Sequence, residues 1–362
     1  MTKDFSVREY QTEDVEEIVT LLRLCFEDWT KIPDPIEYWK SRYENDPYGT
    51  GILVAISEGR IIGVNINLFL QMKIGSKIVP AQYESGSATH PDYRSLGVYK
   101  RLTAKAREQS NAANIKFSYF TSENPYMIKR AKENDYFVFP HPVNRMIKVK
   151  NVGLFLKQRH LKNETTKLLG FKTLKIANKL RRSITPIHRK NPVNINKTES
   201  LDERIDNFWQ KLETSYDFLV KKDKKCLNWK YSDRRVGEFT IRQAVENSEV
   251  LGFSVLETRK RGETTEGYIQ ELLTRPDRPD VASALIEDAS KFYNDTGANA
   301  IHCLCIGGHP YGQLYENAGF ISAMKRYISG NFRQLEGFTN QKAASIIGGF
   351  PSSRTQFSLG DL

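Results

Sequence analysis

Hydrophobic and polar positions along the first 150 residues alternate between the helical and the strand period. TEDVEEIVTLLRLCF (12–26) repeats apolar residues at helical spacing behind Thr12 and a run of acids, and so predicts an amphipathic helix. GILVAISEG, RIIGVNINLFLQMKI and KIVPAQYESGSAT are strand-like stretches separated by glycine-containing turns. With the flanking segments, the pattern predicts the order β-α-α-β-β-β-α-β-α-β, which is an α/β fold with layered helices and sheet.

The second half of the chain repeats motifs of the first half. EYWKSRY (37–43) matches LNWKYSD (227–233), RIIGVNI matches EVLGFSV, THPD matches TRPD, and ENDYF matches ENAGF. The first three matches have similar offsets of 190, 189 and 185 residues. Matches that keep their order and spacing predict a duplicated unit. We therefore expect two α/β domains, at 1–150 and 201–332, joined by a linker at 151–200 and followed by a tail at 333–362.

Positive charge is concentrated in the linker. The chain of 362 residues carries a net charge of +11, and residues 151–190 contain eleven Lys or Arg but one acid, Glu164. The net charge of the remaining residues is close to zero, so only this basic helical segment suggests an anionic binding partner. It is open to three interpretations: a solvated arm between domains, a helix attracted to an anionic membrane surface, or a contact with RNA.

Other features of the composition narrow the class of protein. There is no apolar run of transmembrane length, no signal-peptide pattern at the start, and only four scattered cysteines, so we expect a cytoplasmic protein without a disulfide framework. His302, Cys303 and Cys305 have metal-ligand chemistry but lie in the predicted strand AIHCLCI. Alternation places both cysteines on one face and His302 on the other, which favours core packing over a metal site.

The stretch SATHPDYRSLGVYKRLTAKAREQ (87–109) carries the strongest functional signal. It predicts the end of a strand, a tight turn at 94–97, and a helix. Backbone amides at a helix N-terminus bind phosphate groups, and Gly97 would let a ligand approach the backbone closely. The alternative is an ordinary helix start in which Val98 and Leu102 face the core.

This stretch resembles the acetyl-CoA motif of the GNAT acetyltransferases, which reads Arg or Gln, x, x, Gly, x, Gly or Ala. Tyr99 departs from the last position of that pattern. The resemblance implies two GNAT-like domains, each a mixed central sheet flanked by helices. It also implies acetyl-CoA as the acyl donor. The cofactor-binding residues that it implies are Ser87, Ala88, Thr89, Arg94, Ser95, Leu96, Gly97, Val98, Tyr99, Lys100 and Asn124.

The second copy lacks the phosphate-binding turn and helix start of the first copy (94–100), which we call the cradle. In TRPDRPDVASAL, Pro279 stands in place of Arg94 and Ala282 in place of Gly97, so an N–H donor and the close approach are both lost. Its LYENAGF resembles the Tyr-x-x-x-Gly-Phe helix end of the family, whose tyrosine often protonates the leaving thiolate. We expect Tyr315 of that motif to pack in its own domain. The matching helix of the first copy contains Ala131 but no tyrosine there.

Because the family tyrosine has no counterpart in the first copy, the catalytic groups are assigned from their positions along the chain. Glu84, on the strand that leads to the turn, is a candidate base, with a solvated strand glutamate as the alternative. Tyr126 is the candidate acid. Asn124 beside it could contact the cofactor or cap the following helix. Asp361, close to the end of the chain, is a candidate for binding a cationic substrate, with a disordered terminus as the alternative.

The leading hypothesis is an N-acetyltransferase that moves an acetyl group from acetyl-CoA to a primary amine of a small molecule, such as an amino sugar. The arrangement resembles tandem GNAT enzymes with an active first copy and a degenerate second copy. Two alternatives remain open. One is an aminoacyl transferase of the peptidoglycan-crossbridge type, which uses aminoacyl-tRNA, and the other is a non-catalytic module that binds acyl-CoA.

Overall fold

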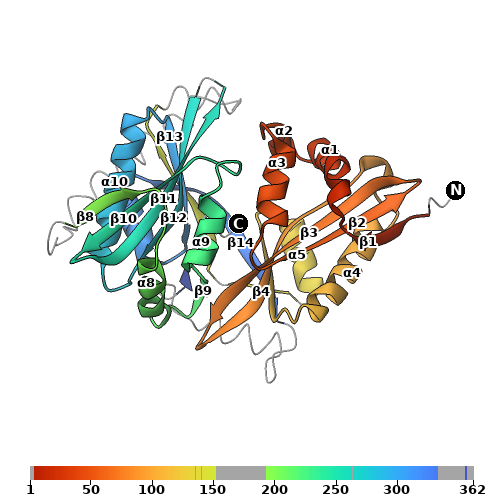
Figure 1. Cartoon of the computed structure of the whole chain (residues 1–362), viewed down its shortest axis with the longest axis horizontal. Coiled ribbons are helices and arrows are strands. Elements are labelled where there is room, and N and C mark those ends of the chain that lie inside the picture. Colours follow the sequence, from red (N-terminus) through yellow and green to blue (C-terminus); the bar gives the residue numbers. More distant parts are fainter. Residues whose placement is uncertain are drawn as a thin grey trace.

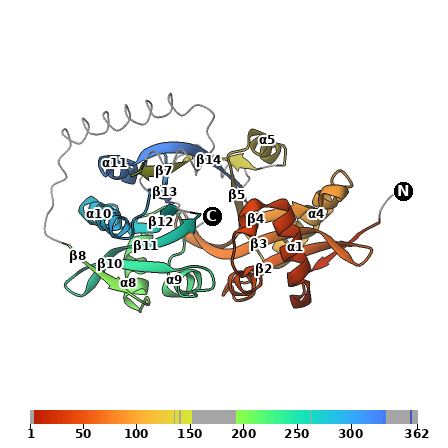
Figure 2. The same cartoon turned by 90° about the horizontal axis from the view of Figure 1, so that it is seen from above.

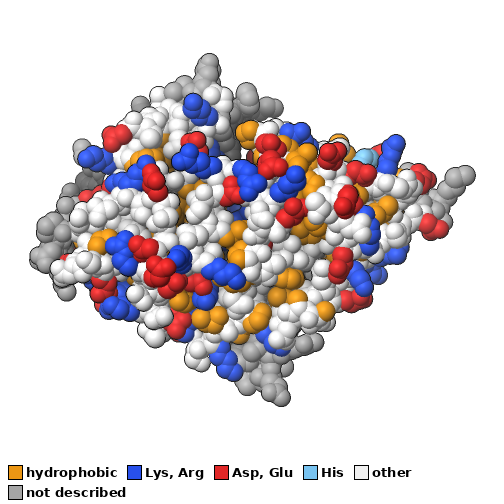
Figure 3. All heavy atoms as spheres, in the orientation of Figure 1, with side chains coloured by type: hydrophobic (Ala, Val, Ile, Leu, Met, Phe, Trp, Pro, Cys, Tyr) orange, Lys and Arg blue, Asp and Glu red, His pale blue; other side chains and the backbone are white. Residues whose placement is uncertain are grey.

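The computed structural model describes residues 4–134, 136–139, 141–151, 193–262, 264–332 and 355–356. Sheets flanked by helices build both halves of the chain, which confirms the predicted α/β class (Figure 1). Asp361 and nearly all of the basic segment at 151–190 lie outside the described residues. On the face seen in Figure 3, acidic and basic side chains are interspersed.

The first half follows the predicted order, with the short helix α2 and the strand β7 as additions. Its elements are β1 (Ser6–Glu9), η1 (Thr12–Asp14), α1 (Val15–Cys25), α2 (Glu27–Thr30), α3 (Pro35–Trp39), η2 (Lys40–Glu44), β2 (Thr50–Ser57), β3 (Arg60–Ile74), β4 (Lys77–Thr89), η3 (Pro91–Tyr93), α4 (Val98–Ala112), β5 (Phe117–Ser122), α5 (Pro125–Glu133), β6 (Phe137–Val138) and β7 (Val143–Val149).

The second half has a similar order of elements. They are β8 (Asn194–Thr198), α8 (Arg204–Glu213), β9 (Phe218–Val220), α9 (Lys224–Tyr231), β10 (Phe239–Glu246), β11 (Glu249–Arg261), β12 (Thr264–Thr274), α10 (Pro279–Asp295), β13 (Ala300–Ile306), α11 (Pro310–Asn317) and β14 (Ile321–Phe332). A short strand, β15 (Thr355–Gln356), pairs with β9 in parallel.

Alternation along β3 explains how the helices cover the first sheet. Val64 and Ile66 face the core that β3 forms with α1 and α3. Residues of the opposite face meet α4, whose Val98 and Leu102 are fully buried. Gly63 makes this contact possible, because a Cβ at that position would lie 2.7 Å from a methyl group of Val98.

The two halves exchange their last strands. β14 runs antiparallel to β5 from Tyr327 opposite Ser122 to Phe332 opposite Phe117. In return, β7 of the first half runs antiparallel to β13 of the second. The result is one continuous path of strands, β1-β2-β3-β4-β5-β14-β7-β13-β12-β11-β10-β8, with β14 at the junction (Figure 2).

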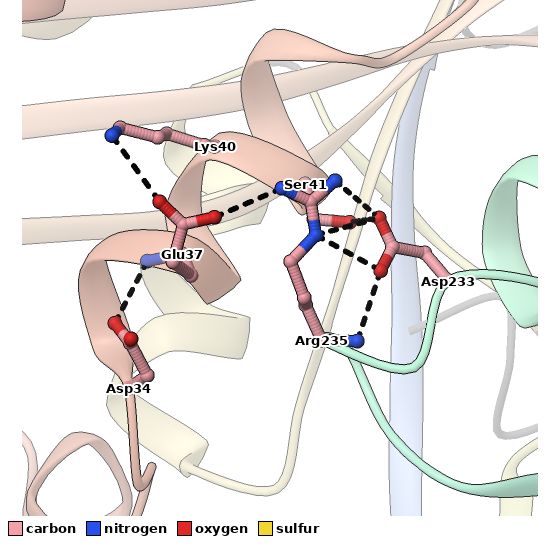
Figure 4. Close-up of polar contacts among 6 residues, drawn as sticks. All are labelled: Asp34, Glu37, Lys40, Ser41, Asp233 and Arg235. Carbon is pink, nitrogen blue, oxygen red and sulfur yellow. Dashed lines mark hydrogen bonds and ion pairs between the residues drawn. The ribbon is translucent and has the colours of Figure 1, made fainter.

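An aromatic core and a polar cluster hold this junction together. Phe117 and Phe139 of the first half both pack on Phe218 of the second, with ring centroids 5.6 and 4.8 Å apart. At the surface, Arg235 donates to Glu37 at 2.9 Å and also binds Asp233. Asp233 accepts a hydrogen bond from Ser41 as well (Figure 4). The halves are therefore joined by backbone pairing, packing and charge.

The exchanged strand can be tested at Gly330. A Cβ there would lie 2.7 Å from the buried ring of Phe117, so we expect Gly330→Ala to lower the free energy of unfolding by about 1–3 kcal/mol. Gly312→Ala is the matched control. Its Cβ would meet only the Cys305 sulfur at 3.9 Å, and alanine suits its helix, so stability should stay the same or rise. Equal stability of both variants in chemical denaturation would contradict the packing at the junction.

Candidate functional site

A cleft opens where β4 and β5 diverge. The two strands pair in parallel over only three positions, from Ala81 opposite Phe117 to Tyr83 opposite Tyr119. Beyond that point lies a cleft of about 790 Å³ between β4, β5, α4 and α5. The residues that line it include Asn65, Asn67, Gln82, Glu84, Ser85, Gly86, Ser87, Tyr99, Lys100, Thr103, Arg107, Phe120, Ser122, Arg130, Ala131 and Tyr136.

An irregularity in β4 shapes the wall of the cleft. Gly86 lies opposite Ile66 and Glu84 opposite Asn67, so Ser85 is an extra residue in the strand. Directly opposed residues of an antiparallel pair point to the same face. Glu84 and Asn67 therefore share a face, and both line the cleft.

Buried polar groups form the floor next to Glu84. Asn67 is 2% exposed and its Nδ2 donates to Asn65 Oδ1 at 3.1 Å. Asn65 in turn donates to the Ser87 hydroxyl at 2.8 Å. Among the described residues, the Oδ1 atom of Asn67 has no hydrogen-bond partner. A buried acceptor in this state is suited to a ligand or water that brings an N–H or O–H.

The N-terminus of α4 borders the same cleft. Gly97 is its N-cap and has the left-handed φ of 81°, and Ser95 in the same turn has a φ of 71°. The first amide bonded within the helix is that of Arg101, which donates to Gly97 O at 3.0 Å. Within the described residues, the amides of Val98, Tyr99 and Lys100 have no backbone acceptor, as expected for the first turn of a helix. Nothing lies within 4 Å of a Cβ placed on Gly97, so a ligand can approach there.

The other predicted cofactor residues lie along the same strand and turn. Ser87, Tyr99 and Lys100 line the cleft. Ala88 is buried against α1, and the Thr89 carbonyl accepts from Cys25 Sγ at 3.6 Å. Arg94, Ser95, Leu96 and Val98 belong to the turn and helix start but do not line the cleft, and Leu96 is 42% exposed.

The candidate acid and its neighbour lie at the start of α5. Asn124 Oδ1 accepts from the Tyr126 amide at 3.0 Å, so Asn124 caps this helix, which was the alternative to cofactor contact. Tyr126 is 63% exposed, its hydroxyl accepts from Arg130 at 3.3 Å, and it is not among the residues that line the cleft.

A tyrosine that the sequence analysis did not select lies in the cleft instead. The hydroxyl of Tyr136, just after α5, donates to Glu84 Oε1. In the matched pair ENDYF and ENAGF, Tyr136 stands where the second copy has Gly319. This difference between the two copies is the feature of the sequence that could have pointed to Tyr136 as a site residue.

Charges of both signs surround Glu84. Lys100, Arg107 and Arg130 line the cleft with it. Burial, and then the negative charge of Glu84, raise the pKa of the Tyr99 hydroxyl. The guanidinium of Arg130 lies 5.3 Å above the Tyr99 ring. The cleft thus combines one carboxylate with phenols and cations.

Comparisons with known proteins agree with this geometry. The acetyltransferase (GNAT) domain profile matches residues 6–131, which include the cleft up to Ala131. Residues 6–131 are a GNAT-family domain. None of the curated protein sequences compared with this chain matches it.

Solved structures extend the likeness in fold to most of the chain. A GCN5-related N-acetyltransferase from Anabaena variabilis has a TM-score of 0.61 and 11% identity, and covers 91% of this chain and 73% of its own. A probable N-acyltransferase from Enterococcus faecalis has a TM-score of 0.60 and 12% identity, with the same coverage. N-myristoyltransferase of Saccharomyces cerevisiae, with bound myristoyl-CoA, has a TM-score of 0.61 and 11% identity, and covers 90% of this chain and 78% of its own.

The second half has the same strand geometry as the GNAT domain, but its cleft is filled. β12 and β13 also pair in parallel over three positions, and Gln270 is the extra residue of β12. The Tyr311 hydroxyl, from α11, accepts from the Thr274 amide at 2.9 Å. Tyr315 is 2% exposed and packs on Phe320 in the core. Aromatic side chains of the protein thus occupy the end of this strand.

The helix start in the second half is also closed to an anion. α10 begins at Pro279, and Ala282 is fully buried. Asp280, in the first turn, is bound by Arg278 at 2.9 Å, and this ion pair holds the pKa of the Asp280 carboxyl below its usual value. A carboxylate already takes the place at the helix N-terminus that a phosphate would need.

His302 and the two cysteines pack as the strand pattern predicts. Cys303 and Cys305 belong to the core next to α10 and α11, and burial raises the pKa of the Cys305 thiol to about 12. His302 lies on the other face, stacked on Tyr268 with a ring separation of 4.9 Å. Within the described ranges, no group of His, Cys, Asp and Glu side chains is placed to hold a metal, and no helix could cross a membrane.

The filled cleft of the second half can be tested by removing one hydroxyl. Tyr311→Phe keeps the ring but leaves the buried Thr274 amide without its acceptor, so we expect it to lower the free energy of unfolding by about 1–3 kcal/mol. Tyr126→Phe, at an exposed hydroxyl, should change stability by less than about 0.5 kcal/mol. A stability of Tyr311→Phe equal to that of the wild type would show that this hydroxyl does not close the strand end.

Proposed function

We propose that this protein is an N-acyltransferase that moves an acetyl group from acetyl-CoA to a primary amine of a small molecule. The observation that carries the proposal is the combination, in one cleft, of a helix N-terminus open to an anion and a carboxylate at the divergence of β4 and β5. The match of residues 6–131 to the GNAT domain supports it.

The residues at the cleft fit the parts of acetyl-CoA. The amides of residues 98–100, with the open space at Gly97, suit a pyrophosphate, and Lys100 and Arg107 add positive charge. The strand end at Ser87 to Thr89 offers backbone groups to the pantetheine arm. Acetyl-CoA would supply an activated thioester.

Glu84 is the proposed general base. The attacking nitrogen of an amine must lose a proton during acyl transfer, and a carboxylate within the cleft can accept it. Glu84 lines the cleft beside the extra residue Ser85, where β4 leaves β5.

The acceptor is proposed to be polar, as an amino sugar would be. Asn67 offers a buried carbonyl oxygen without a partner among the described residues, and it faces the same side as Glu84. Asn65 and Gln82 add further amide groups to this wall. Such a wall favours hydroxyl and amino groups over a long alkyl chain.

We further propose that the chain arose by duplication and has one working site. The order of elements, the three-residue parallel pairing and the extra strand residue occur in both halves, which supports a common origin. The ring of Tyr311 and the charge of Asp280 oppose cofactor binding in the second half.

The proposed activity can be tested by following release of the CoA thiol with a thiol-reactive dye. The purified chain would be mixed with acetyl-CoA and a panel containing glucosamine, spermidine, ethanolamine and lysine. We expect thiol release that depends on one of these amines and on Glu84, and a Glu84→Gln variant slower by about 100-fold or more. Equal rates with and without every amine would contradict amine acetylation.

The proposed binding of the pyrophosphate at the start of α4 can be tested by placing a negative charge there. Gly97→Glu places a negative charge at the start of α4, so we expect calorimetry to show one acetyl-CoA site per chain in the wild type and none in the variant. Gly59→Glu is the matched control, because Gly59 also has a positive φ, of 75°, and open space around it, but lies in the turn between β2 and β3 and not at a helix start. Wild-type affinity in Gly97→Glu would refute the assignment.

A further inference from the structure

A tyrosine closes the narrow end of the cleft. Tyr83 is the last residue of β4 that pairs with β5 before the two strands diverge, and it lies opposite Tyr119. The rings of Tyr83 and Tyr119 pack on each other with centroids 5.2 Å apart. Tyr83 and Thr121, two residues further along β5, both line the cleft. The Tyr83 side chain therefore extends from β4 to β5 at the point where the cleft ends.

The cleft reaches both faces of the sheet at this end. Gln82, Tyr83 and Glu84 are consecutive and all three line it, although neighbours on a strand point to opposite faces. Gln82 faces α4, because it accepts a hydrogen bond from Ser110 of that helix at 2.7 Å. Tyr83 faces the other side, where it packs on the core that contains α1 and α3. A group that passes Glu84 thus meets the Tyr83 ring.

Apolar side chains lie behind Tyr83. Its ring packs against two hydrophobic clusters, one that includes Tyr43 and Ile66 and another that includes Phe218 and Ile328. Burial raises the pKa of the Tyr83 hydroxyl, so the phenol stays neutral at ordinary pH. The ring therefore separates the polar cleft from apolar surroundings that would suit an alkyl chain.

We propose that Tyr83 limits the length of the acyl group, by closing the cleft behind an acetyl methyl group and excluding longer chains. This inference rests on the proposed function and deepens it. It makes short-chain acyl-CoA the class of donor, and it makes Tyr83 the residue that determines this specificity.

The proposed positions of the other parts of acetyl-CoA direct the acyl group toward Tyr83. The pyrophosphate would lie at the amides of 98–100, and the pantetheine arm would run back along Ser87 to Thr89. The carbon that the amine attacks must lie near Glu84, the proposed base. Tyr83 is the next residue in the same direction along β4. A longer chain on that carbon would need the space that the Tyr83 ring fills.

The wild type can be tested without knowing the acceptor. Calorimetry would compare acetyl-CoA, butyryl-CoA and hexanoyl-CoA. We expect affinity to fall with chain length, with hexanoyl-CoA bound about 10-fold or more weakly than acetyl-CoA, because extra methylene groups overfill a closed space. CoA itself serves as the reference for binding of the shared part of the molecule.

Tyr83→Ala should reverse this order. It opens the cleft to the two hydrophobic clusters, where each buried methylene group can improve binding by up to roughly fourfold. We expect the ratio of hexanoyl-CoA to acetyl-CoA affinity to rise by about 10-fold or more. Tyr83→Leu, which removes less of the side chain, should raise the ratio by a smaller factor and is the second variant if the alanine variant does not fold.

Two control variants separate the length limit from other effects. Tyr83→Phe keeps the ring, so it should keep the wild-type ratio. Tyr99→Ala removes a tyrosine that lines the same cleft at α4, away from its narrow end, and should change the affinities for both acyl-CoAs alike. Circular dichroism and titration with CoA show whether each variant retains the fold and the cofactor site.

The outcomes distinguish the two proposals. A ratio that rises in Tyr83→Ala or Tyr83→Leu and stays at the wild-type value in Tyr83→Phe supports the length limit. Equal wild-type affinity for acetyl-CoA and hexanoyl-CoA, or an unchanged ratio in the folded variants, overturns it and leaves the proposed function standing. Failure of the wild type to bind any of these CoA compounds overturns the proposed function and this inference with it.

Discussion

The short pairing between β4 and β5 is the constraint on which the rest of this structure depends. A strand that is bonded to its neighbour over three residues and then diverges leaves backbone groups without a partner on that edge. β5 compensates on its other edge, where β14 pairs with it from Phe117 to Ser122. The cleft can stay open because the last strand of the second half supports the strand that forms its wall.

This dependence gives the second half a structural role even though its own cleft is filled. Tyr311 binds Thr274 at the end of β12, Tyr315 is buried in the same half, and Asp280 with Arg278 occupies the helix start. These contacts add buried packing and an ion pair to the second half. We interpret the second half as a scaffold that lends β14 to the first half and receives β7 in exchange.

Local features of the sequence predicted much of the fold and part of the site. Periodicity gave the order of elements, because each helix and strand buries one face. The turn at Gly97 was predictable because a left-handed residue before a helix favours glycine. Glu84 was selected from its place on the strand, and it lines the cleft.

Features that depend on distant parts of the chain were not predictable in this way. The hydrophobic pattern of β14 shows that it is a strand but not that its partner is β5. Tyr136 reaches Glu84 only because α5 and the divergence of β4 and β5 bring together residues 52 positions apart. From its sequence context Asn124 fitted both a cap and a ligand contact, and the bond to the Tyr126 amide, which no local pattern specifies, shows that it is a cap.

Hydrogen–deuterium exchange with and without acetyl-CoA tests the central claim most directly, because one experiment observes both halves. One working cleft should give slower amide exchange on ligand addition in peptides covering 84–103, from the extra residue of β4 into the first turns of α4. Peptides covering 270–286, from Gln270 into α10, should exchange at the same rate in both conditions. Equal protection of the two regions, or protection of 270–286 alone, would contradict a single site in the first half.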